Sequence, residues 1–460
     1  MDEVKYVLGV DLGTTAVKVC LVDQSSRQKV LQLSQATKAS LNAIQPQDEQ
    51  CPEKILLALQ YCLSTIDKEL LKRVVKIAVC GQMHGVVLWK KNAWRYELAK
   101  ERFAFNKENI SNLITWQDRR CTKDFLEGLP RKSSSSFGDV SSGFGCASLF
   151  WLLKNGSLSQ DYECAGTIQD LVVAMLTDRE TPVMTSHNAA SFGYFNPEDN
   201  RWDVGALASA DFPCYLLPEV VDESQQAGKL KYFWFGIPAR TPVFAAFGDT
   251  QCSALSALQE NKNTALLNMG TSSQLSFVSD SREIHPRGDY SYFPYFDRRY
   301  LCVAASLNGG NILSHLVATL RCWLEELGAP LPESKIWERL LSPQSSDSPN
   351  IRVNPQLFGE RHDPDLTGSV LDLTPAIPSL DMTFRATCAG LLENLITTLP
   401  LKILQDQSIA SIVCCGKVIN HNVVLRTEVK RIFADFAVDF GKNCESAYGA
   451  ALAAIVYARS

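Results

Sequence analysis

The residues from Asp11 to Thr15 have the sequence Asp-Leu-Gly-Thr-Thr, which suits a turn that binds phosphate. An apolar strand precedes this stretch, and a strand of alternating apolar and polar residues follows it. Gly13 permits a tight turn, and Thr14 and Thr15 offer hydroxyl and N–H donors to an oxyanion. Asp11 ends the first strand with a carboxylate, the ligand type that Mg²⁺ prefers. The stretch therefore predicts a phosphate-binding hairpin, with Asp11 holding Mg²⁺ through water.

A second stretch repeats this order in the other half of the chain. The residues from Asn268 to Ser272 have the sequence Asn-Met-Gly-Thr-Ser and lie between an apolar strand and an alternating strand. Its Gly270, Thr271 and Ser272 take the places of the glycine and the two threonines. Two such hairpins predict two related domains that bind one nucleotide. The alternative for each stretch alone is an ordinary hairpin turn rich in glycine and threonine.

Asp249 is a candidate general base. It follows a buried strand at 241–247 and precedes a helix of small residues at 252–258. Phosphoryl transfer to a hydroxyl group needs in-line positioning, Mg²⁺ at the phosphates and a carboxylate that accepts the hydroxyl proton. Asp11 and Asp249 supply the two carboxylates for this chemistry. The alternative role for Asp249 is a helix N-cap.

Polar and aromatic residues follow two further strands of the first half. Gln82, Met83 and His84 come directly after a buried strand, and Trp116 and Asp118 come after a short one. Ligands of open α/β sheets bind where strands end, and a tryptophan ring can stack on the face of a sugar. These five residues are therefore candidate sugar ligands. The alternatives are a core aromatic for Trp116 and a helix N-cap for Asp118.

The second half offers candidate nucleotide ligands. Gly309 and Gly310 follow a strand at 301–305, and a pair of glycines lets the backbone approach a ligand closely. Gly416 and Asn420 follow another buried strand. We expect these four residues to line a nucleotide cleft.

The elements that must position these residues alternate between strands and helices, which predicts an α/β protein. A chain of 460 residues is too long for one compact core, so we expect two domains, at 1–245 and 246–460. The polar stretch 186–191 is predicted to be a loop, with His187 forming loop hydrogen bonds. Buried strands are expected at 74–80, 241–247 and 411–415, and helices at 51–71, 147–154, 167–176 and 385–399.

Composition excludes several classes of function. The net charge of −5 does not indicate a surface that binds nucleic acid, and the apolar stretches are shorter than a membrane span. The fifteen cysteines lack a Cys-x-x-Cys pair, and several lie in apolar strands, which indicates reduced thiols and a cytoplasmic protein. The N-terminus leads directly into a strand, with no signal peptide expected. We expect small molecules as partners, with no nucleic acid or membrane; a monomer and a dimer both stay open.

The order of these motifs resembles the FGGY family of carbohydrate kinases, in the actin-like and hexokinase-like ATPase superfamily. The motifs are Asp-x-Gly-Thr, Gln-Met-His-Gly, Trp-x-Asp-x-Arg, Gly-Asp and Gly-Thr-Ser. The resemblance implies two ribonuclease H-like α/β domains flanking a central cleft, with ATP and Mg²⁺ as cofactors. It also implies that Asp249 is the catalytic base, that Asp11 supports Mg-ATP, and that Met83 and His84 contact the sugar. The chain has Cys415-Gly416-Lys417 where the family often has a glycine pair.

The substrate expectation comes from the same resemblance. Gln-Met-His-Gly at 82–85 is similar to the ketose kinases, whereas glycerol kinases carry Arg-Glu at this point. The whole sequence looks most like the kinases of the seven-carbon ketose sedoheptulose, which phosphorylate its C7 hydroxyl and serve the pentose phosphate pathway. One alternative is a xylulokinase that acts on D-xylulose. An alternative of another class is a non-catalytic nucleotide-binding scaffold of the same superfamily.

Overall fold

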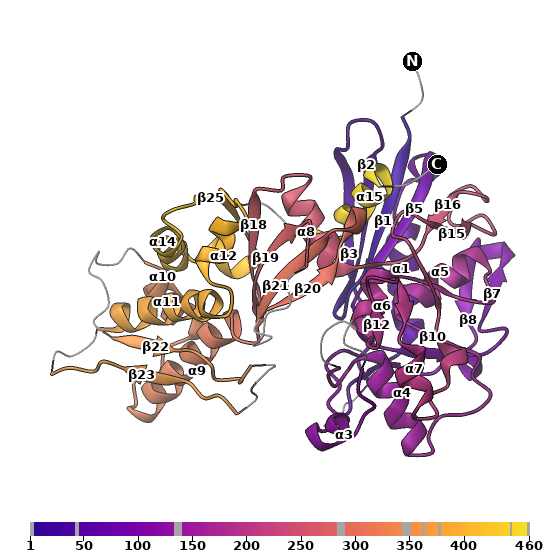
Figure 1. The fold of residues 1–460 in the computed structure, drawn as a ribbon. Helices are drawn as coiled ribbons and strands as arrows, with labels where there is room; N and C mark the ends of the chain where they lie inside the picture. Colours follow the sequence, from indigo (N-terminus) through magenta and orange to yellow (C-terminus); the bar gives the residue numbers. More distant parts are fainter. Residues whose placement is uncertain are drawn as a thin grey trace. The chain divides into compact units, whose positions relative to one another are not determined.

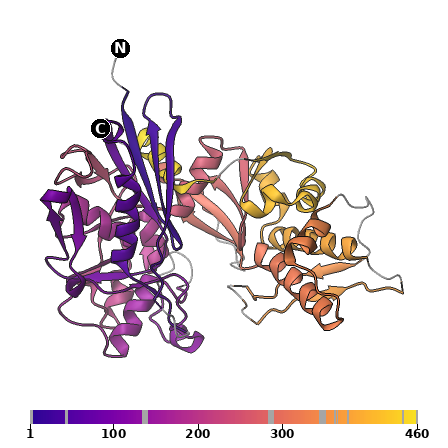
Figure 2. The ribbon, with the colours of Figure 1, turned by 180° about the vertical axis from the view of Figure 1, so that it is seen from behind.

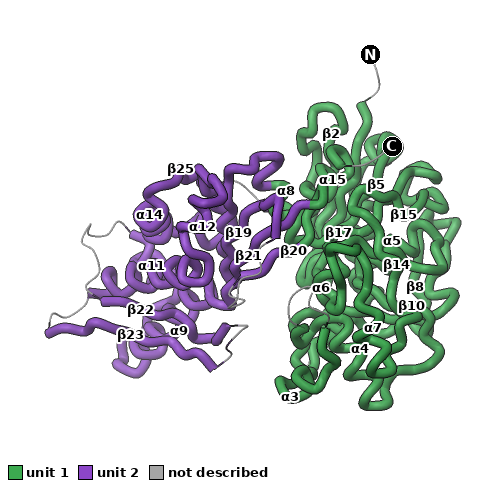
Figure 3. Tube along the Cα trace, viewed as in Figure 1, with its two compact units in different colours: residues 1–256, 294–298, 445–460 green, residues 257–293, 299–444 purple. Residues whose placement is uncertain are grey.

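The structure is a computed structural model, and its chain forms two compact units (Figures 1 and 3). Unit 1 comprises residues 1–256, 294–298 and 445–460, and unit 2 comprises residues 257–293 and 299–444. Each unit contains one large mixed sheet with helices packed on it. The residues that the structure describes are 4–41, 46–132, 140–282, 290–342, 351–360, 363, 365–375, 379–441 and 444–457.

A seven-stranded sheet forms the centre of unit 1, in the order β15-β16-β5-β1-β2-β3, with β17 also paired to β5. Strands β1, β2 and β3 form an antiparallel meander, whereas β5 pairs in parallel with β1, β16 and β17. Every residue of β1 is buried, as expected for a central strand covered on both faces. The strands are β1 (Tyr6–Leu12), β2 (Ala16–Asp23), β3 (Lys29–Ala36), β5 (Val74–Gly81), β15 (Gln226–Lys229), β16 (Pro242–Phe244) and β17 (Phe247–Gly248).

Helices cover the two faces of this sheet with different kinds of residue. Leu8 and Val10 of β1 belong to the apolar core that also includes α1 (Pro52–Ser64) and α5 (Ile168–Thr177). On the other face, helix α15 (Ser446–Val456) lies against β1 and β5, although it is at the opposite end of the sequence (Figures 1 and 2). A Cβ atom on Gly9 would lie 1.9 Å from the Ala447 carbonyl oxygen, so the close approach of α15 requires glycine there.

Shorter elements complete unit 1. The predicted loop at 186–191 is wrong: these residues form helix α6, and all of its residues are buried. The elements are β4 (Glu49–Gln50), α2 (Lys68–Leu71), β6 (Val87–Trp89), β7 (Trp94–Glu97), β8 (Arg102–Phe105), β9 (Leu113–Ile114), α3 (Lys123–Glu127), α4 (Gly145–Lys154), β10 (Cys164–Gly166), β11 (Val183–Thr185), α6 (Ser186–Phe192), β12 (Phe195–Asn196), β13 (Arg201–Trp202), α7 (Val204–Ala208), β14 (Glu219–Val221) and α8 (Asp249–Leu258).

Unit 2 repeats the plan of an antiparallel hairpin joined to parallel strands. Its six-stranded sheet has the order β20-β21-β19-β18-β24-β25, with β18 antiparallel to β19 and parallel to β24. The elements are β18 (Thr264–Met269), β19 (Ser273–Ser279), β20 (Ser291–Pro294), β21 (Tyr300–Ser306), α9 (Gly310–Glu326), α10 (Glu333–Leu341), β22 (Arg352–Asn354), β23 (Ser369–Leu371), α11 (Leu380–Thr398), α12 (Leu401–Asp406), β24 (Ser411–Cys415), α13 (Lys417–His421), α14 (Val423–Ile432) and β25 (Ala437–Phe440).

The boundary between the units differs from the sequence expectation of 245/246. Unit 1 continues to residue 256, and the C-terminal helix returns to it. Small residues allow this return, because a Cβ atom on Gly449 would lie 1.8 Å from the Cys252 carbonyl oxygen. No helix in the described ranges is long and apolar enough to cross a membrane.

Candidate active site

The carboxyl ends of three parallel strands bring the candidate residues of unit 1 together. In the sheet register, Asp11 of β1 and Phe247 of β17 both pair with Cys80 of β5. Gln82 directly follows β5, and Asp249 directly follows β17. The structure therefore places Asp11, Gln82 and Asp249 at one edge of one sheet, which is where such sheets bind ligands.

In the first hairpin, the carbonyl groups of Thr14 and Thr15 accept hydrogen bonds from neighbouring residues, whereas the N–H groups of the turn are available to a ligand. The Thr14 carbonyl oxygen accepts hydrogen bonds from Gln50 Nε2 at 2.9 Å and from Thr37 Oγ1 at 3.3 Å. The Thr15 carbonyl oxygen accepts from the Thr37 N–H at 3.0 Å. Among the described residues, the N–H groups of Gly13, Thr14 and Thr15 have no acceptor. Adjacent free N–H groups in a turn make a concave site for an anion.

Asp11 is buried, and only one of its oxygens is satisfied. Its Oδ2 atom lies 3.3 Å from Lys18 Nζ, whereas Oδ1 has no hydrogen-bond partner within the described residues. Burial raises the pKa of Asp11, and the Lys18 charge and the Ser446 hydroxyl oppose that rise. An unpartnered carboxylate oxygen fits Mg²⁺, which binds through one or two carboxylates together with substrate phosphates.

Asp249 begins helix α8 and is half-buried. Its Oδ1 atom accepts a hydrogen bond from Thr250 Oγ1 at 3.2 Å. Burial raises the pKa of Asp249 to about 7, the Asp11 charge adds to the rise, and the Thr250 hydroxyl opposes it. A carboxylate that titrates near neutral pH suits a general base.

Met83 lies beside the end of β17, and His84 contacts helix α6. A Cβ atom on Gly248 would lie 2.8 Å from Met83 Sδ, so this side chain packs on the residue that precedes Asp249. His84 has a left-handed backbone with φ of 73°. Its Nδ1 atom lies 2.9 Å from the Ser191 carbonyl oxygen, and its ring stacks on Phe144 with centroids 4.5 Å apart. The imidazole is therefore fixed in orientation.

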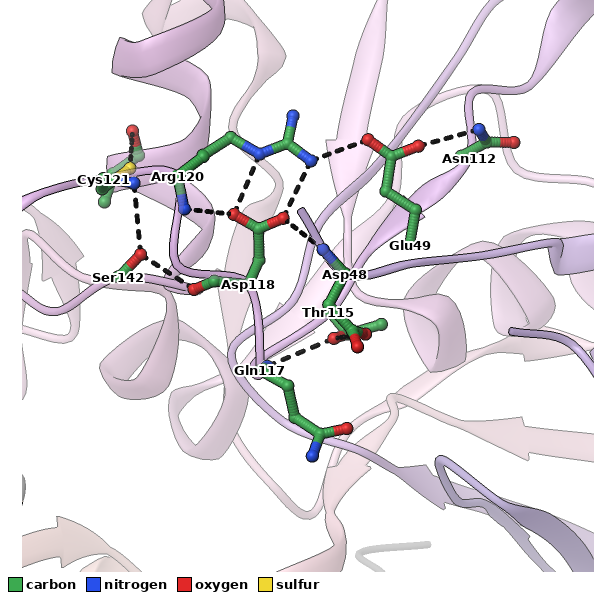
Figure 4. A network of polar contacts seen from close by, with 10 residues as sticks. Asp48, Glu49, Asn112, Thr115, Gln117, Asp118, Arg120, Cys121 and Ser142 are labelled. Atoms are coloured by element: carbon green, nitrogen blue, oxygen red, sulfur yellow. Dashed lines mark hydrogen bonds and ion pairs between the residues drawn. The ribbon is translucent and has the colours of Figure 1, made fainter. Parts of the chain in front are cut away.

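Trp116 and Asp118 have different surroundings. Trp116 Nε1 donates a hydrogen bond to Thr14 Oγ1 at 3.1 Å, which ties the indole to the phosphate hairpin. The Asp118 carboxylate is fully buried, and both of its oxygens are occupied (Figure 4). Oδ1 accepts from Arg120 N and Nε at 3.0 and 2.9 Å, and Oδ2 accepts from Arg120 Nη2 and Asp48 N at 2.8 and 2.9 Å. With four donors already on it, Asp118 holds the loop and offers no free acceptor to a sugar.

The candidate glycines of unit 2 pack against the second hairpin. The Gly310 N–H donates to the Gly270 carbonyl oxygen at 2.9 Å. A Cβ atom on Gly309 would lie 2.5 Å from the Ser272 carbonyl carbon, and one on Gly416 would lie 2.2 Å from the Met269 carbonyl oxygen. The glycines therefore pack directly on the turn that carries Thr271 and Ser272. Asn420 Oδ1 is buried without a partner in the described part of the chain.

The comparison with known proteins decides the family. The model of the FGGY family of carbohydrate kinases, N-terminal domain, matches residues 6–256. The chain belongs to this family. Sedoheptulokinases of Mus musculus and Homo sapiens are each 39% identical to this carbohydrate kinase over 97% of its chain and 96% of their own. A xylulose kinase of Staphylococcus xylosus is 23% identical over 98% of this chain and 90% of its own.

Solved structures confirm the predicted fold class. The crystal structure of xylulose kinase from Rhodospirillum rubrum aligns with a TM-score of 0.80 and 18% identity, covering 98% of this chain and 89% of that one. At this identity the similarity shows the fold alone, which is the two-domain actin-like ATPase fold of FGGY sugar kinases. The predicted enzyme class is also confirmed: the chain is a carbohydrate kinase, and its family implies the use of ATP.

Several residues that contact the candidate site residues or their neighbouring segments have no motif that marks them in the sequence. Lys18 of β2 pairs with Asp11 of β1 in the antiparallel register. The short turn and the alternation of apolar and polar residues in β2 could have predicted this pairing. Gln169 is fully buried, and its Nε2 atom donates to the Gly81 and Gln82 carbonyl oxygens at 3.2 Å. Glu360 accepts from Ser306 Oγ at 2.6 Å and from the Leu307 N–H at 3.1 Å, which fixes the loop after β21. Gln169 and Glu360 are distant in sequence from the segments that they bind, which are residues 81–82 and 306–307.

Proposed function

We propose that this kinase transfers the γ-phosphoryl group of ATP to the C7 hydroxyl of sedoheptulose. The observation that carries the proposal is the 39% identity with two sedoheptulokinases over nearly the whole chain, against 23% with a xylulose kinase. The grouping of Asp11, Gln82 and Asp249 at one sheet edge supports it. D-xylulose is the alternative substrate.

In the proposed reaction, Asp249 is the general base. As the sugar hydroxyl oxygen bonds to the γ-phosphorus, its proton passes to the Asp249 carboxylate and the bond to ADP breaks. A pKa of about 7 leaves the ionised form well populated above neutral pH and keeps it basic enough to accept the proton. The Asp11 charge is one cause of that raised pKa, so Asp11 contributes to the basicity of Asp249.

Asp11 and the two hairpins are proposed to bind Mg-ATP. The free N–H groups at Thr14 and Thr15 and the hydroxyls of Thr271 and Ser272 are donors for phosphate oxygens. Asp11 would hold Mg²⁺, which neutralises phosphate charge when bound. The close-packed backbone at Gly309, Gly310 and Gly416 is proposed to contact the nucleotide, together with Asn420 and with Gly270, where a Cβ atom would meet nothing within 4 Å.

Gln82, Met83, His84 and Trp116 are proposed to contact the sugar. Their support is position, because they follow strand ends beside Asp249 or reach the first hairpin. Asp118 is proposed to position Trp116 through its bonds to Arg120 and Asp48. We also propose a cytoplasmic location, since all fifteen cysteines are free thiols, most of them buried.

A substrate panel tests the proposal. ADP release is measured with sedoheptulose, D-xylulose and glycerol, and the product is identified by mass and by the phosphorus–proton couplings that locate the phosphate. A site that hydrogen-bonds the extra hydroxyls discriminates by several orders of magnitude, up to about 10⁴-fold, against a shorter sugar. Sedoheptulose should therefore give the highest kcat/KM. Equal or better use of D-xylulose refutes the heptose assignment, and ADP release that no sugar stimulates favours the scaffold alternative.

A further inference from the structure

Three residues near the first hairpin form a closed ring of hydrogen bonds. Thr14 Oγ1 donates to Gln82 Oε1 at 3.2 Å, Gln82 Nε2 donates to Gln50 Oε1 at 3.0 Å, and Gln50 Nε2 donates to the Thr14 carbonyl oxygen at 2.9 Å. Gln50 and Gln82 are 4% and 3% exposed. The ring joins the phosphate hairpin, the end of β5 and strand β4.

The direction of every bond in this ring is set by the Thr14 carbonyl group, which can only accept. Gln50 must therefore present its amide nitrogen to that carbonyl and its oxygen to Gln82. Gln82 in turn must present its nitrogen to Gln50 and its oxygen to Thr14. If either amide turned over, two oxygens or two NH₂ groups would face each other in a buried place, which is costly. The hydroxyl hydrogen of Thr14 is committed to Gln82 as a result.

Gln50 itself is held by a rigid neighbour. It lies in β4, which pairs with β9, and the adjacent Glu49 accepts from Arg120 Nη2 at 2.7 Å (Figure 4). Asp118 binds both Arg120 and the Asp48 N–H, so charged and backbone contacts fasten the strand that carries Gln50. Gln50 therefore has a fixed backbone on one side and a fixed acceptor on the other.

The ring also reaches the indole of Trp116. Trp116 Nε1 donates to Thr14 Oγ1 at 3.1 Å, while that oxygen gives its own hydrogen to Gln82. Within the described residues, one lone pair of the Thr14 hydroxyl and one N–H of the Gln82 amide stay uncommitted. The ring thereby defines one acceptor and one donor of fixed orientation at the sheet edge that carries Asp11.

We propose that Gln50 is a positioning residue for phosphoryl transfer. It orients the Gln82 amide on the sugar side and the Thr14 turn on the phosphate side with one buried side chain, and it touches neither substrate. This inference rests on the proposed roles of Thr14 and Gln82. Small errors in the placement of reacting groups can lower the rate about 10²-fold, which is the size of the effect we expect.

The first test compares Gln50→Leu and Gln50→Glu with a matched control. Gln60 is 4% exposed and donates through Nε2 to the Phe103 carbonyl oxygen at 2.7 Å, away from the sheet edge, so Gln60→Leu removes an equivalent bond. We expect Gln50→Leu to lower kcat/KM for sugar about 10²-fold with thermal stability close to that of Gln60→Leu. Values of kcat/KM within twofold for the two variants overturn the inference.

Gln50→Glu adds a signature that a merely structural role does not produce. An ionised glutamate places an oxygen against the Thr14 carbonyl oxygen and breaks the ring, whereas a protonated one donates to it and restores the ring. The activity of Gln50→Glu relative to wild type should therefore rise as pH falls from 8 to 6, while the ratio for Gln50→Leu stays constant. A constant ratio for Gln50→Glu contradicts the proposed bond polarity.

A double-mutant cycle completes the design and separates this inference from the site assignment. If Gln50 acts through Thr14, the Gln50→Leu/Thr14→Val double variant should be no worse than the more impaired single variant. Additive losses refute the coupling. If Thr14→Val and Gln82→Met leave kcat/KM unchanged, the proposed site itself fails; if they lower it and Gln50→Leu does not, only the role of Gln50 fails.

Discussion

Replacing Asp249 with asparagine should abolish most of the activity and at the same time stabilise the protein above neutral pH. The pKa of Asp249 rises from 3.8 to about 7, mainly through burial and secondly through the Asp11 charge. Because the folded protein holds this proton more tightly than the unfolded chain, its stability falls as pH rises from about 4 to 7 and then stays constant. The ionised carboxylate that is proposed to accept the hydroxyl proton is thus a source of instability.

The size of this effect follows from the shift. A rise of about 3 pKa units corresponds to about 4 kcal/mol at 1.36 kcal/mol per unit. The side chain is half-buried, so water screens part of the penalty and we expect about 1–3 kcal/mol. Asparagine carries no charge and avoids this cost. In a domain of this size the gain corresponds to a rise in Tm of a few degrees.

The assay is thermal unfolding of wild type and Asp249→Asn from pH 4 to pH 8, with ADP release measured at the same pH values. The difference in Tm should be absent near pH 4, grow through pH 6 and level off above about pH 7, while turnover falls about 10²–10⁴-fold. A variant that is less stable than wild type at pH 8 refutes the electrostatic reasoning. A variant that keeps half of wild-type turnover refutes the role of base.

Three further substitutions test other parts of the structure. Asp11→Asn should weaken the use of Mg-ATP with little change in sugar affinity, as read from initial rates with each substrate varied; a selective loss of sugar affinity contradicts the assignment. Asp118→Asn should cost about 1.5–3 kcal/mol in a denaturant titration, because it weakens charge-assisted hydrogen bonds to a buried guanidinium that then has Glu49 as its charged partner; a loss below about 1 kcal/mol contradicts this. Gly9→Ala should cost several kcal/mol, because its Cβ would collide with the backbone of α15, whereas Gly205→Ala, with only Asp203 Oδ1 at 4.0 Å, should be nearly neutral. Equal stability of the two glycine variants excludes the close packing described for Gly9.

The sequence predicted those parts of the site that depend on neighbouring residues. The first hairpin has an apolar strand, a glycine turn and an alternating strand within eighteen residues, so its shape and its acidic residue are local properties. The meeting of Asp11, Gln82 and Asp249 follows from a general rule, since each ends a strand and the strands are parallel.

Predictions failed or fell short where distant contacts outweigh local composition. Helix α6 begins Ser-His-Asn, which favours a loop, but the fold buries all its residues, including His187 with both ring nitrogens unpartnered in the described structure. Burial lowers the pKa of His187 to about 3, so it packs as a neutral ring against Phe296. The sequence offered Asp118 as a sugar ligand or a helix N-cap, and its contacts with Arg120 and Asp48 were not predicted. The Gln50 ring spans segments that no local pattern connects.

The packing of α15 on Gly9 has a consequence for the order in which the chain acquires structure on the ribosome. The first strand emerges early, but the helix that covers one of its faces emerges about 440 residues later, which is about 20–90 s at ordinary rates of elongation. During that interval one face of the nascent sheet lacks its covering helix, and the strands of the unit 2 sheet all emerge before α15 does. Emergence of α15, rather than synthesis of residues 1–256, is therefore the event that completes unit 1, and nascent chains stalled before α15 should bind general chaperones.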